Sequence, residues 1–217
     1  KVVIPEGLTV KEIAELFLEV KPPLGGLTST WFENFDKKEF LEKTAGLEGY
    51  LFPDTYLFLP GAEMEQIIGT MTDNFRKKAG DIGQDIVIMA SLIEKEVSDS
   101  GDRKIVSGIL WKRLEIGMPL QVDAVFPYIT GKREILSDDL KIDSPYNTYL
   151  YKGLPLGPIA NPGLDAIISA MNPIETKYLF YISDKKGITH FAATLEDHNK
   201  NIEKYLKSVY QKPFIKK

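Results

Sequence analysis

The sequence predicts an α+β protein. We expect a small α/β lobe over residues 1–44, followed by a mixed α+β domain over residues 45–217 with a central buried helix. Three observations predict this class. Several segments carry apolar residues at helical spacing, and a few short segments read as strands between turn signals. The chain has 217 residues, of which 43% are hydrophobic, enough for a small domain attached to a larger one.

The first 44 residues predict strand, helix, loop and helix in that order. "KVVIPEG" is a short strand that ends in a Pro-Glu-Gly turn. Thr9 is expected to cap a helix over residues 10–19, with Glu12 at the capping-box position. The prolines and glycines of "KPPLGGLTST" then break that helix, and a second helix is expected over 31–43.

The larger domain is predicted to be mostly helical, with two strands near its end. "LEGYLFPDTYLFLPG" is expected to be extended, with a kink at Pro53. "YLFYISD" and "THFAAT" are the two expected strands, and the stretch 118–162 is expected to be rich in loops. Apolar spacing predicts five helices, over 63–78, 84–97, 103–115, 164–171 and 195–210.

Composition excludes some functions and leaves others open. The net charge of −4 gives no electrostatic reason to expect nucleic acid as a partner. The absence of cysteine excludes disulfides and thiolate metal sites. No run approaches the roughly 18 to 20 apolar residues that span a bilayer. The chain opens on Lys1 without an initiator Met or a signal peptide, so we expect that a targeting or anchoring segment is missing.

The helix expected over 84–97 carries carboxylates in an apolar setting. Its apolar side chains cover nearly the whole circumference, which is typical of a buried helix. At about 100° per residue, Glu94 lies within about 40° of Val87 and Ala90, and Glu96 lies similarly close to Met89 and Leu92. The two glutamates point about 160° apart, so they cannot grip one small group together.

Burial raises the pKa of a carboxyl group, as a general acid near neutral pH requires. The alternative is that Glu-Lys-Glu near a helix end is a solvated face with a few salt bridges. The helical geometry does not separate Glu94 from Glu96. Either residue could serve a site while the other has a structural role.

Other candidate groups are fewer. His190 and His198 have no HExxH motif and no cysteine partner, so neither a metal site nor a cofactor is predicted. His190, next to Phe191, either lines a cleft or is a hydrogen-bonded residue at a strand edge. Gln121 and Asp123 of "QVD" either present polar groups to a ligand or belong to a solvated turn.

Two loop motifs favour a carbohydrate groove. "PYNTY" supplies Tyr146 and Tyr149, and "GLPLGPIANPG" over 153–163 has three prolines and three glycines among mostly apolar residues. This composition predicts a rigid, packed loop, unlike a flexible linker. Aromatic rings and amides together suit a polysaccharide, by stacking on sugars and bonding to their hydroxyl groups. The alternative is a loop packed for stability alone.

Seven stretches in a fixed order resemble the endolytic murein transglycosylases, the YceG-like or MltG family. They span residues 3–205 and read "IPEGLTVKEIA", "LEGYLFPDTY", "ASLIEKE", "RLEIGMPLQVD", "SPYNTY", "GLPLGPIANPG" and "HFAATLEDHN". The chain departs from the family pattern at Lys112, where relatives usually have Asn. It also has Ala124-Val125 where relatives have Pro-Thr after the aspartate.

The resemblance implies a LysM-like module over 1–44 and a catalytic domain over 45–217. It implies a single-pass anchor in the bacterial membrane, absent from this chain, with the catalytic domain on the extracytoplasmic face. Peptidoglycan glycan strands are the implied substrate, and cell-wall synthases are expected partners. Glu94 is the implied catalytic acid. The implied substrate-contacting residues are Glu96, Gln121, Asp123, Tyr146, Asn147, Thr148 and His190.

The implied reaction needs one carboxyl group and neither metal nor cofactor. Glu94 is expected to protonate the bond between N-acetylmuramic acid and N-acetylglucosamine, and then to accept the muramyl C6 hydroxyl proton. The product is a 1,6-anhydro end that terminates strand elongation. The alternatives are a water-using muramidase, with Asp123 as the second carboxylate, and a non-catalytic glycan-binding scaffold.

Overall fold

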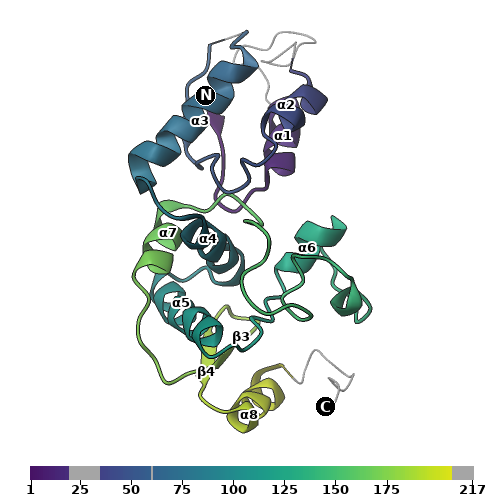
Figure 1. Ribbon diagram of the computed structural model, residues 1–217, viewed down its shortest axis with the longest axis vertical. Coiled ribbons are helices and arrows are strands. Elements are labelled where there is room, and N and C mark those ends of the chain that lie inside the picture. The colour runs from purple at the N-terminus through teal and green to yellow at the C-terminus, as the bar shows by residue number, and fades with distance from the viewer. Residues whose placement is uncertain (20–34, 60, 207–217) are drawn as a thin grey trace.

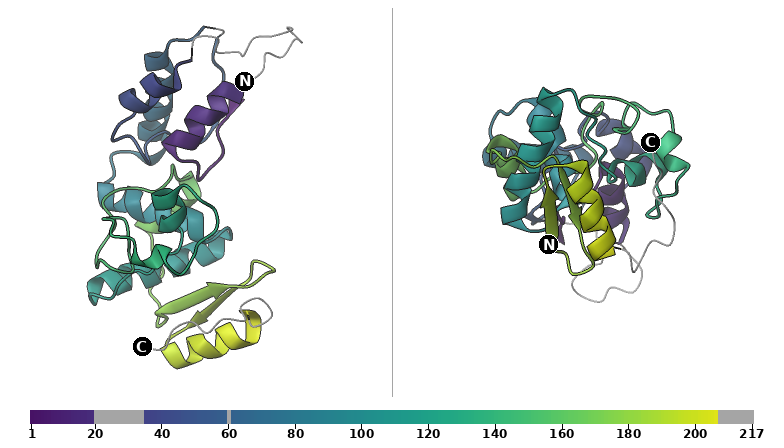
Figure 2. Two further views of the ribbon diagram at one scale, coloured as in Figure 1. Left: turned by 90° about the vertical axis from the view of Figure 1, so that its right-hand side faces the viewer. Right: turned by 90° about the horizontal axis from the view of Figure 1, so that it is seen from below.

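The computed structural model describes residues 1–19, 35–59 and 61–206. In this part of the chain, helices combine with two small antiparallel sheets, which confirms the α+β class. Figure 1 shows an elongated molecule with an upper lobe, a central helical layer and a lower hairpin. The side view in Figure 2 shows the same three tiers, with the hairpin and α8 at the lower end.

The helices are α1 (Val10–Glu19), α2 (Lys37–Lys43), α3 (Met64–Ala79), α4 (Gln84–Glu96), α5 (Ser100–Glu115), α6 (Val125–Thr130), α7 (Leu164–Met171) and α8 (Leu195–Leu206), with a short 3-10 turn η1 (Asp139–Lys141). The strands are β1 (Val2–Val3), β2 (Thr55–Tyr56), β3 (Phe180–Ser183) and β4 (Thr189–Ala192). β1 pairs with β2 and β3 with β4, both antiparallel.

The upper lobe begins as the sequence predicts. Thr9 and Glu12 form the expected capping box: Thr9 N–H donates to the Glu12 carboxylate at 2.8 Å, and Glu12 N–H donates to Thr9 Oγ1 at 3.1 Å. The second helix starts later than predicted, at Lys37. Asp36 caps it by accepting from Lys38 N–H and Glu39 N–H. The predicted segment 31–34 lies outside the described residues.

The packing of the upper lobe extends beyond residue 44. Its apolar cluster joins α1 and α2 to the segment around Leu51, to β2 and to α3 as far as Met71. Side chains on both sides of residue 44, as far as Met71, therefore share one core, and the boundary predicted at residue 44 stays a prediction. That the lobe is LysM-like stays a prediction.

The central layer is organised around α4, whose residues 87–93 are all buried. α4 lies against α7 and α5, with Trp111 of α5 donating its indole N–H to Ala170 O at 3.0 Å. The predicted spans of α3, α4, α5 and α7 agree with the structure to within three residues. Two short helices, α6 and η1, lie in the stretch that was predicted to be loop. α6 is brief, contains Pro127 and ends at left-handed Gly131, so its apolar pattern is too short to stand out.

The loop over 153–163 joins the two lobes. Ser91 Oγ accepts from Ile159 N–H at 3.0 Å, which fixes the loop to α4. The Asn161 side chain accepts from Leu51 N–H at 2.8 Å and donates to Leu8 O at 2.9 Å, which fixes it to the upper lobe. Residues 157–163 are buried, so the prediction of a packed, rigid loop is confirmed. Gly49 has a φ of +89°, and a Cβ there would lie 2.7 Å from both Pro158 and Val87. Only glycine therefore fits at this contact between residue 49, the loop and α4.

The lower hairpin places alternate residues on opposite faces. Tyr181 is paired with Phe191, and Ile182 with His190, so Tyr181 and His190 point to opposite sides of the sheet. The two strands are confirmed. α8 begins at Leu195 as predicted, and its predicted end at residue 210 lies outside the described part.

Candidate active site

Glu96, the last residue of α4, lies among polar groups from three separate segments. Its carboxylate accepts from the Tyr181 hydroxyl at 3.0 Å and from Ala124 N–H at 3.2 Å. Asp123 and Arg113 are close enough to influence its charge. The residue as a whole is half-buried, and its carboxyl group lies among these partners. Helix α4, strand β3 and the turn before α6 therefore meet at one carboxyl group.

The surroundings of Glu96 favour its protonated form. Burial raises the pKa of Glu96 from 4.5 to about 7, and the negative charge of Asp123 adds to the rise. The hydrogen bonds from Ala124 and Tyr181 and the charge of Arg113 oppose it. A carboxyl group with a pKa near 7 is able both to donate and to accept a proton at neutral pH.

Glu94 has different partners on the opposite side of the same helix. One oxygen binds Arg103 Nη2 at 2.7 Å, and the other accepts from Gly163 N–H at 2.9 Å. Its side chain is 6% exposed and that of Arg103 is 8% exposed. Arg103 also binds Asp165 at 3.0 Å and donates from Nε to Val97 O at 2.9 Å. Glu94 therefore belongs to a buried ion-pair network, which we call the Glu94–Arg103 hub.

The catalytic assignment of Glu94, which rested on the resemblance, stays a prediction. Glu94 accepts from Arg103 and from Gly163 N–H, whereas Glu96 accepts from the Tyr181 hydroxyl and Ala124 N–H and lies near the Asp123 carboxylate. The two glutamates therefore have different kinds of partner, a cation in one case and neutral donors in the other.

Asp123 lies near Glu96 on the turn that precedes α6, and Gln121 stands two residues before it. Both are exposed, and the Tyr149 hydroxyl donates to Asp123. Gln121 has a φ of +51°, the one positive φ at a non-glycine residue in the described chain. Such conformations are often retained at functional sites. Of the two, Asp123 is brought close to Glu96, and Gln121 donates its backbone N–H to Thr148 O at 3.1 Å.

Asn147 and Thr148 do not reach a ligand, in contrast to their prediction as substrate-binding residues. Both are buried, and Asn147 donates to Leu140 O and Ile142 O. Thr148 Oγ1 accepts from Val122 N–H at 2.9 Å. Their polar groups satisfy the backbone of the surrounding loops, so they shape the turn that carries Gln121 and Asp123.

Tyr146 and His190 have different outcomes. Tyr146 is half-buried and packs on Tyr128, with ring centroids 5.0 Å apart, in the wall formed by α6 and the following loop. His190 lies on the face of the hairpin away from Glu96. There it binds Asp184 at 3.0 Å and stacks on Tyr205 of α8. The predicted place of His190 at the cleft rim is not supported, because strand alternation turns it toward α8.

Two residues near Glu96 were missed by sequence reasoning, Tyr181 and Arg113, whereas Tyr149 had been expected as an aromatic wall of the groove. Tyr181 belongs to a strand motif. Strand alternation predicts on which face of the sheet a side chain lies, but not which residues it contacts. Burial, with the neighbouring Glu96 as the next cause, raises the pKa of Tyr181 well above 10, so its phenol stays a neutral donor. Arg113 is buried and donates to Leu120 O at 2.6 Å and Leu179 O at 2.7 Å, which fixes it near Glu96.

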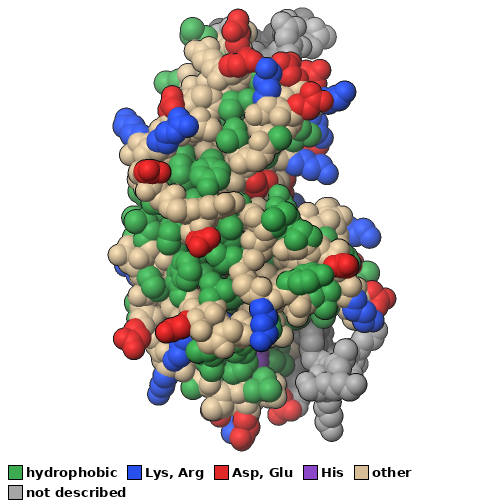
Figure 3. All heavy atoms as spheres, in the orientation of Figure 1, with side chains coloured by type: hydrophobic (Ala, Val, Ile, Leu, Met, Phe, Trp, Pro, Cys, Tyr) green, Lys and Arg blue, Asp and Glu red, His purple; other side chains and the backbone are tan. Residues whose placement is uncertain are grey.

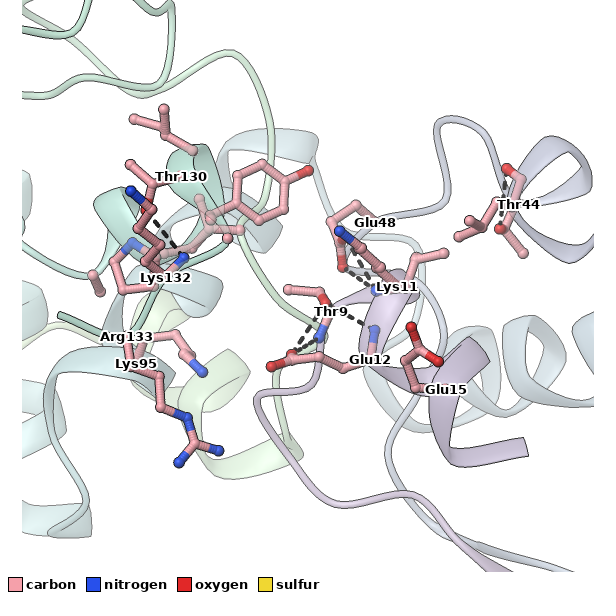
Figure 4. Close-up of a pocket in the computed structure, with 18 of the residues that line it drawn as sticks. Thr9, Lys11, Glu12, Glu15, Thr44, Glu48, Lys95, Thr130, Lys132 and Arg133 are labelled. Carbon is pink, nitrogen blue, oxygen red and sulfur yellow. Dashed lines mark hydrogen bonds between the residues drawn. The ribbon is translucent and has the colours of Figure 1, made fainter. Parts of the chain in front are cut away.

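A pocket of about 730 Å³ lies next to this site, between the upper lobe and α6. Figure 3 shows it as a notch on the right-hand edge of the molecule. Figure 4 shows Thr130, Lys132, Arg133 and Lys95 on one side and Thr9, Glu12, Glu15 and Glu48 on the other. Lys95 and Ala124 line the pocket, and they are respectively the chain neighbour and a hydrogen-bond donor of Glu96.

Over the described ranges, no three acidic or histidine side chains gather as a metal site would require. In the same ranges, no helix has the length and hydropathy of a membrane span.

The chain is similar to known proteins over most of its length. The chain is 36% identical over 240 residues to a Bacillus subtilis protein named endolytic murein transglycosylase, covering 98% of this chain and 67% of that protein. It is 30% identical to the protein of the same name from Streptococcus pneumoniae D39, covering 94% of this chain and 44% of that protein. A crystal structure of a yceG-like protein from Listeria monocytogenes superposes with a TM-score of 0.78 at 32% identity, covering 92% of this chain and 75% of that one.

Fold and site together define a two-lobed α+β protein with the Glu96 carboxyl group where α4 ends beside the interlobe pocket. The model of the YceG-like family matches residues 1–204. The chain therefore belongs to the YceG-like family, as its sequence motifs predicted.

Proposed function

We propose that this chain is an endolytic murein transglycosylase. In this proposal it is a lyase that cleaves the bond between N-acetylmuramic acid and N-acetylglucosamine within peptidoglycan strands, leaves 1,6-anhydro ends and so terminates strand elongation. Support comes from membership of the YceG-like family and from the relatives that carry this name over nearly the whole of the chain.

The observation that carries the proposal is the setting of Glu96. It accepts from the neutral donors Tyr181 and Ala124, it lies near the Asp123 carboxylate, and burial raises its pKa to about 7. A general acid that must later act as a base works best when its pKa is near the working pH. Glu96 is therefore the proposed catalytic acid and base, in place of Glu94.

The proposed reaction conserves every atom of the strand. Protonated Glu96 gives its proton to the glycosidic oxygen as the bond from muramyl C1 to that oxygen breaks. The muramyl C6 hydroxyl oxygen bonds to C1, and its proton passes to the Glu96 carboxylate. One new free hydroxyl and one 1,6-anhydro ring result, and Glu96 ends in the protonated form in which it began.

The neighbours of Glu96 have distinct proposed roles. Tyr181 and the Ala124 amide hold the carboxyl group in place and stabilise the carboxylate that exists between the two proton transfers. Asp123, fixed by the Tyr149 hydroxyl, keeps negative charge near the sugar, where positive charge develops as the bond breaks. Gln121, which is exposed and has a positive φ, is proposed to bond the substrate.

Three wider proposals accompany this one. The chain spans 44% of the pneumococcal relative and 67% of the Bacillus relative. We propose a single-pass anchor in the bacterial membrane, with this part on the extracytoplasmic face. The upper lobe is proposed as a LysM-like contact for glycan, and cell-wall synthases are proposed partners.

A water-using muramidase is the second candidate, because Asp123 lies close enough to Glu96 to raise its pKa. Hydrolytic glycosidases use two carboxyl groups, one as acid and one as nucleophile or base. Asp123 would fill the second role if water, not the C6 hydroxyl, reached C1.

Product analysis tests both candidates. Purified peptidoglycan is digested with the protein, and the new ends are examined by mass spectrometry. Anhydro ends, which weigh one water less than reducing ends, are expected. Reducing ends would replace the transglycosylase by the muramidase, and no cleavage under any condition would favour a non-catalytic scaffold.

A further inference from the structure

The pocket between the lobes is a separate surface that continues from the proposed site. It has a volume of about 730 Å³, which is in the range of small-ligand sites. One wall comes from α1 and the segment around Glu48, and the other comes from α6 and the residues that follow it. A ligand inside the pocket therefore touches both lobes.

One wall of the pocket carries cations that lack partners. Lys132 and Arg133 follow left-handed Gly131 at the end of α6, and both are exposed. Neither forms an ion pair with any residue in the described ranges. Lys95 of α4, a third cation, donates to Gly7 O in the upper lobe at 3.1 Å. Lys132 and Arg133 therefore remain available to an anion.

The carboxylates on the opposite wall are already engaged. Glu12 accepts from the backbone and hydroxyl of Thr9, and Glu15 is paired with Lys37. Glu48 accepts from Val10 N–H at 3.1 Å and from the Asn161 side chain at 3.0 Å. Lys11 adds a further cation on this side. Among the cations that line the pocket, Lys11, Lys132 and Arg133 thus have no ion-pair partner in the described ranges, and Lys132 and Arg133 lie on the wall opposite these carboxylates.

The position of the pocket restricts which part of a murein strand can enter it. Lys95 and Ala124, which line it, adjoin Glu96, so a strand cleaved at Glu96 passes its opening. The sugar rings carry hydroxyl and acetamide groups and are uncharged. The charges of murein lie on the lactyl-linked peptide of each muramyl residue, which carries several carboxylates.

We propose that this interlobe pocket binds the carboxylate-bearing stem peptide of the muramyl residue being cleaved, with Lys132 and Arg133 pairing with its carboxylates. The inference rests on the proposed function. It makes the protein selective for strands that still carry peptides over strands from which an amidase has removed them. Selectivity comes from charge and not from the sugars, so salt weakens it.

The test compares two soluble substrates, intact peptide-bearing strands and amidase-stripped strands. Neither carries a lipid pyrophosphate, so that no anion other than the peptide carboxylates binds Lys132 and Arg133. Initial rates are measured for the unaltered chain, for Lys132→Ala/Arg133→Ala and for the control Lys185→Ala/Lys186→Ala. The control removes two exposed lysines that are neighbours in the chain and do not line the interlobe pocket. All three proteins are compared by thermal melting.

The pocket variant should lose about three- to tenfold in kcat/KM on peptide-bearing strands, mainly through KM, and change less than twofold on stripped strands. The loss should shrink at 0.5 M NaCl, and the control should match the unaltered chain on both substrates. An equal loss on both substrates, or none, overturns the stem-peptide proposal while the cleavage activity stands. Absence of cleavage of either substrate by the unaltered chain overturns the proposed function itself.

Discussion

The two glutamates near the end of α4 are two residues apart, yet they face different environments. Glu94 is held by Arg103 and Gly163 N–H in the buried hub, whereas Glu96 is held by Tyr181 and Ala124 N–H beside Asp123. Both have little solvent around them. The partners differ: a cation in one case and neutral donors with a nearby anion in the other.

This difference shows that burial alone does not make a carboxyl group a useful acid. Burial acts on a carboxyl group together with the charges and hydrogen-bond donors around it, and these differ between the two glutamates. Because successive turns of a helix sweep the whole circle, one short segment is able to place one carboxylate in each environment. The following predictions test whether the two glutamates are separated in this way.

Replacing Glu96 should have the largest effect. Glu96→Gln keeps the size and a hydrogen-bonding amide but removes the transferable proton, so kcat should fall by about 10² to 10⁴. The matched variant is Glu94→Gln, which should lose less than tenfold in kcat and show its cost in melting temperature. Release of anhydro-muropeptides and thermal melts are measured for both. A folded but inactive Glu94→Gln beside an active Glu96→Gln would restore Glu94 as the acid.

Breaking the hub should cost stability. Arg103→Met leaves the Glu94 carboxylate buried with only Gly163 N–H as a direct donor, and the free energy of unfolding should fall by about 3 to 5 kcal/mol. The control is Arg76→Met, whose ion pair with Asp73 is exposed, with side chains 75% and 73% accessible. That variant should change the free energy by less than about 1 kcal/mol. Denaturant unfolding measures both, and equal effects would show that the hub is no stronger than a surface pair.

The pH dependence of stability should separate the glutamates further. The pKa of Glu96 is raised from 4.5 to about 7 by folding, so its contribution is fully present below pH 4.5 and is lost as pH rises through 7. Between pH 4.5 and 8, stability should fall by about 2 to 3 kcal/mol on account of this residue. Glu96→Gln should lack that part of the slope. Glu48, whose pKa is also raised to about 7 by burial, contributes equally in both proteins and cancels in the difference. Melts of both proteins at several pH values measure this difference. Equal slopes of stability against pH in the two proteins would show that folding does not raise the pKa of Glu96.

Removing one hydroxyl should have the smallest effect. Tyr181→Phe deletes a hydrogen bond that lowers the pKa of Glu96, so this pKa should rise further and kcat/KM should fall about tenfold at pH 7. The decline of kcat/KM on the alkaline side should move to higher pH. Tyr178→Phe is the control, since Tyr178 stacks on Phe191 through its ring. An unchanged pH profile in Tyr181→Phe would remove Tyr181 from the site.

Local sequence patterns predicted most of the helices and both strands of the lower hairpin. The capping box at Thr9 and the apolar spacing of α3, α5 and α7 depend only on near neighbours, and these predictions are confirmed. α6 was missed because six residues give too short a pattern, and the start of α2 was placed too early because Asp36 was not recognised as its cap.

The candidate site was predicted less completely because its partners come from distant segments. Sequence spacing put Glu94 and Glu96 on opposite sides of one helix, but not which side meets Arg103 and which meets Tyr181. Asp123 lies near Glu96, whereas Asn147 and Thr148 turn inward to satisfy loop backbone. Polar residues in a loop motif look alike in sequence whether they bind a ligand or their own backbone.

Asn161 has a consequence for the order in which the molecule forms. Its side chain bonds Leu51 N–H and Leu8 O, which precede it by 110 and 153 residues. Contacts this distant in sequence slow folding, because the loop between them must close first. At the usual 5 to 20 residues per second of synthesis, residue 161 follows residue 51 by about 5 to 20 seconds. During that interval the backbone groups of Leu8 and Leu51 have no Asn161 to bind. The upper lobe, although it is synthesised first, therefore acquires its full set of hydrogen bonds only after the loop over 153–163 has been synthesised.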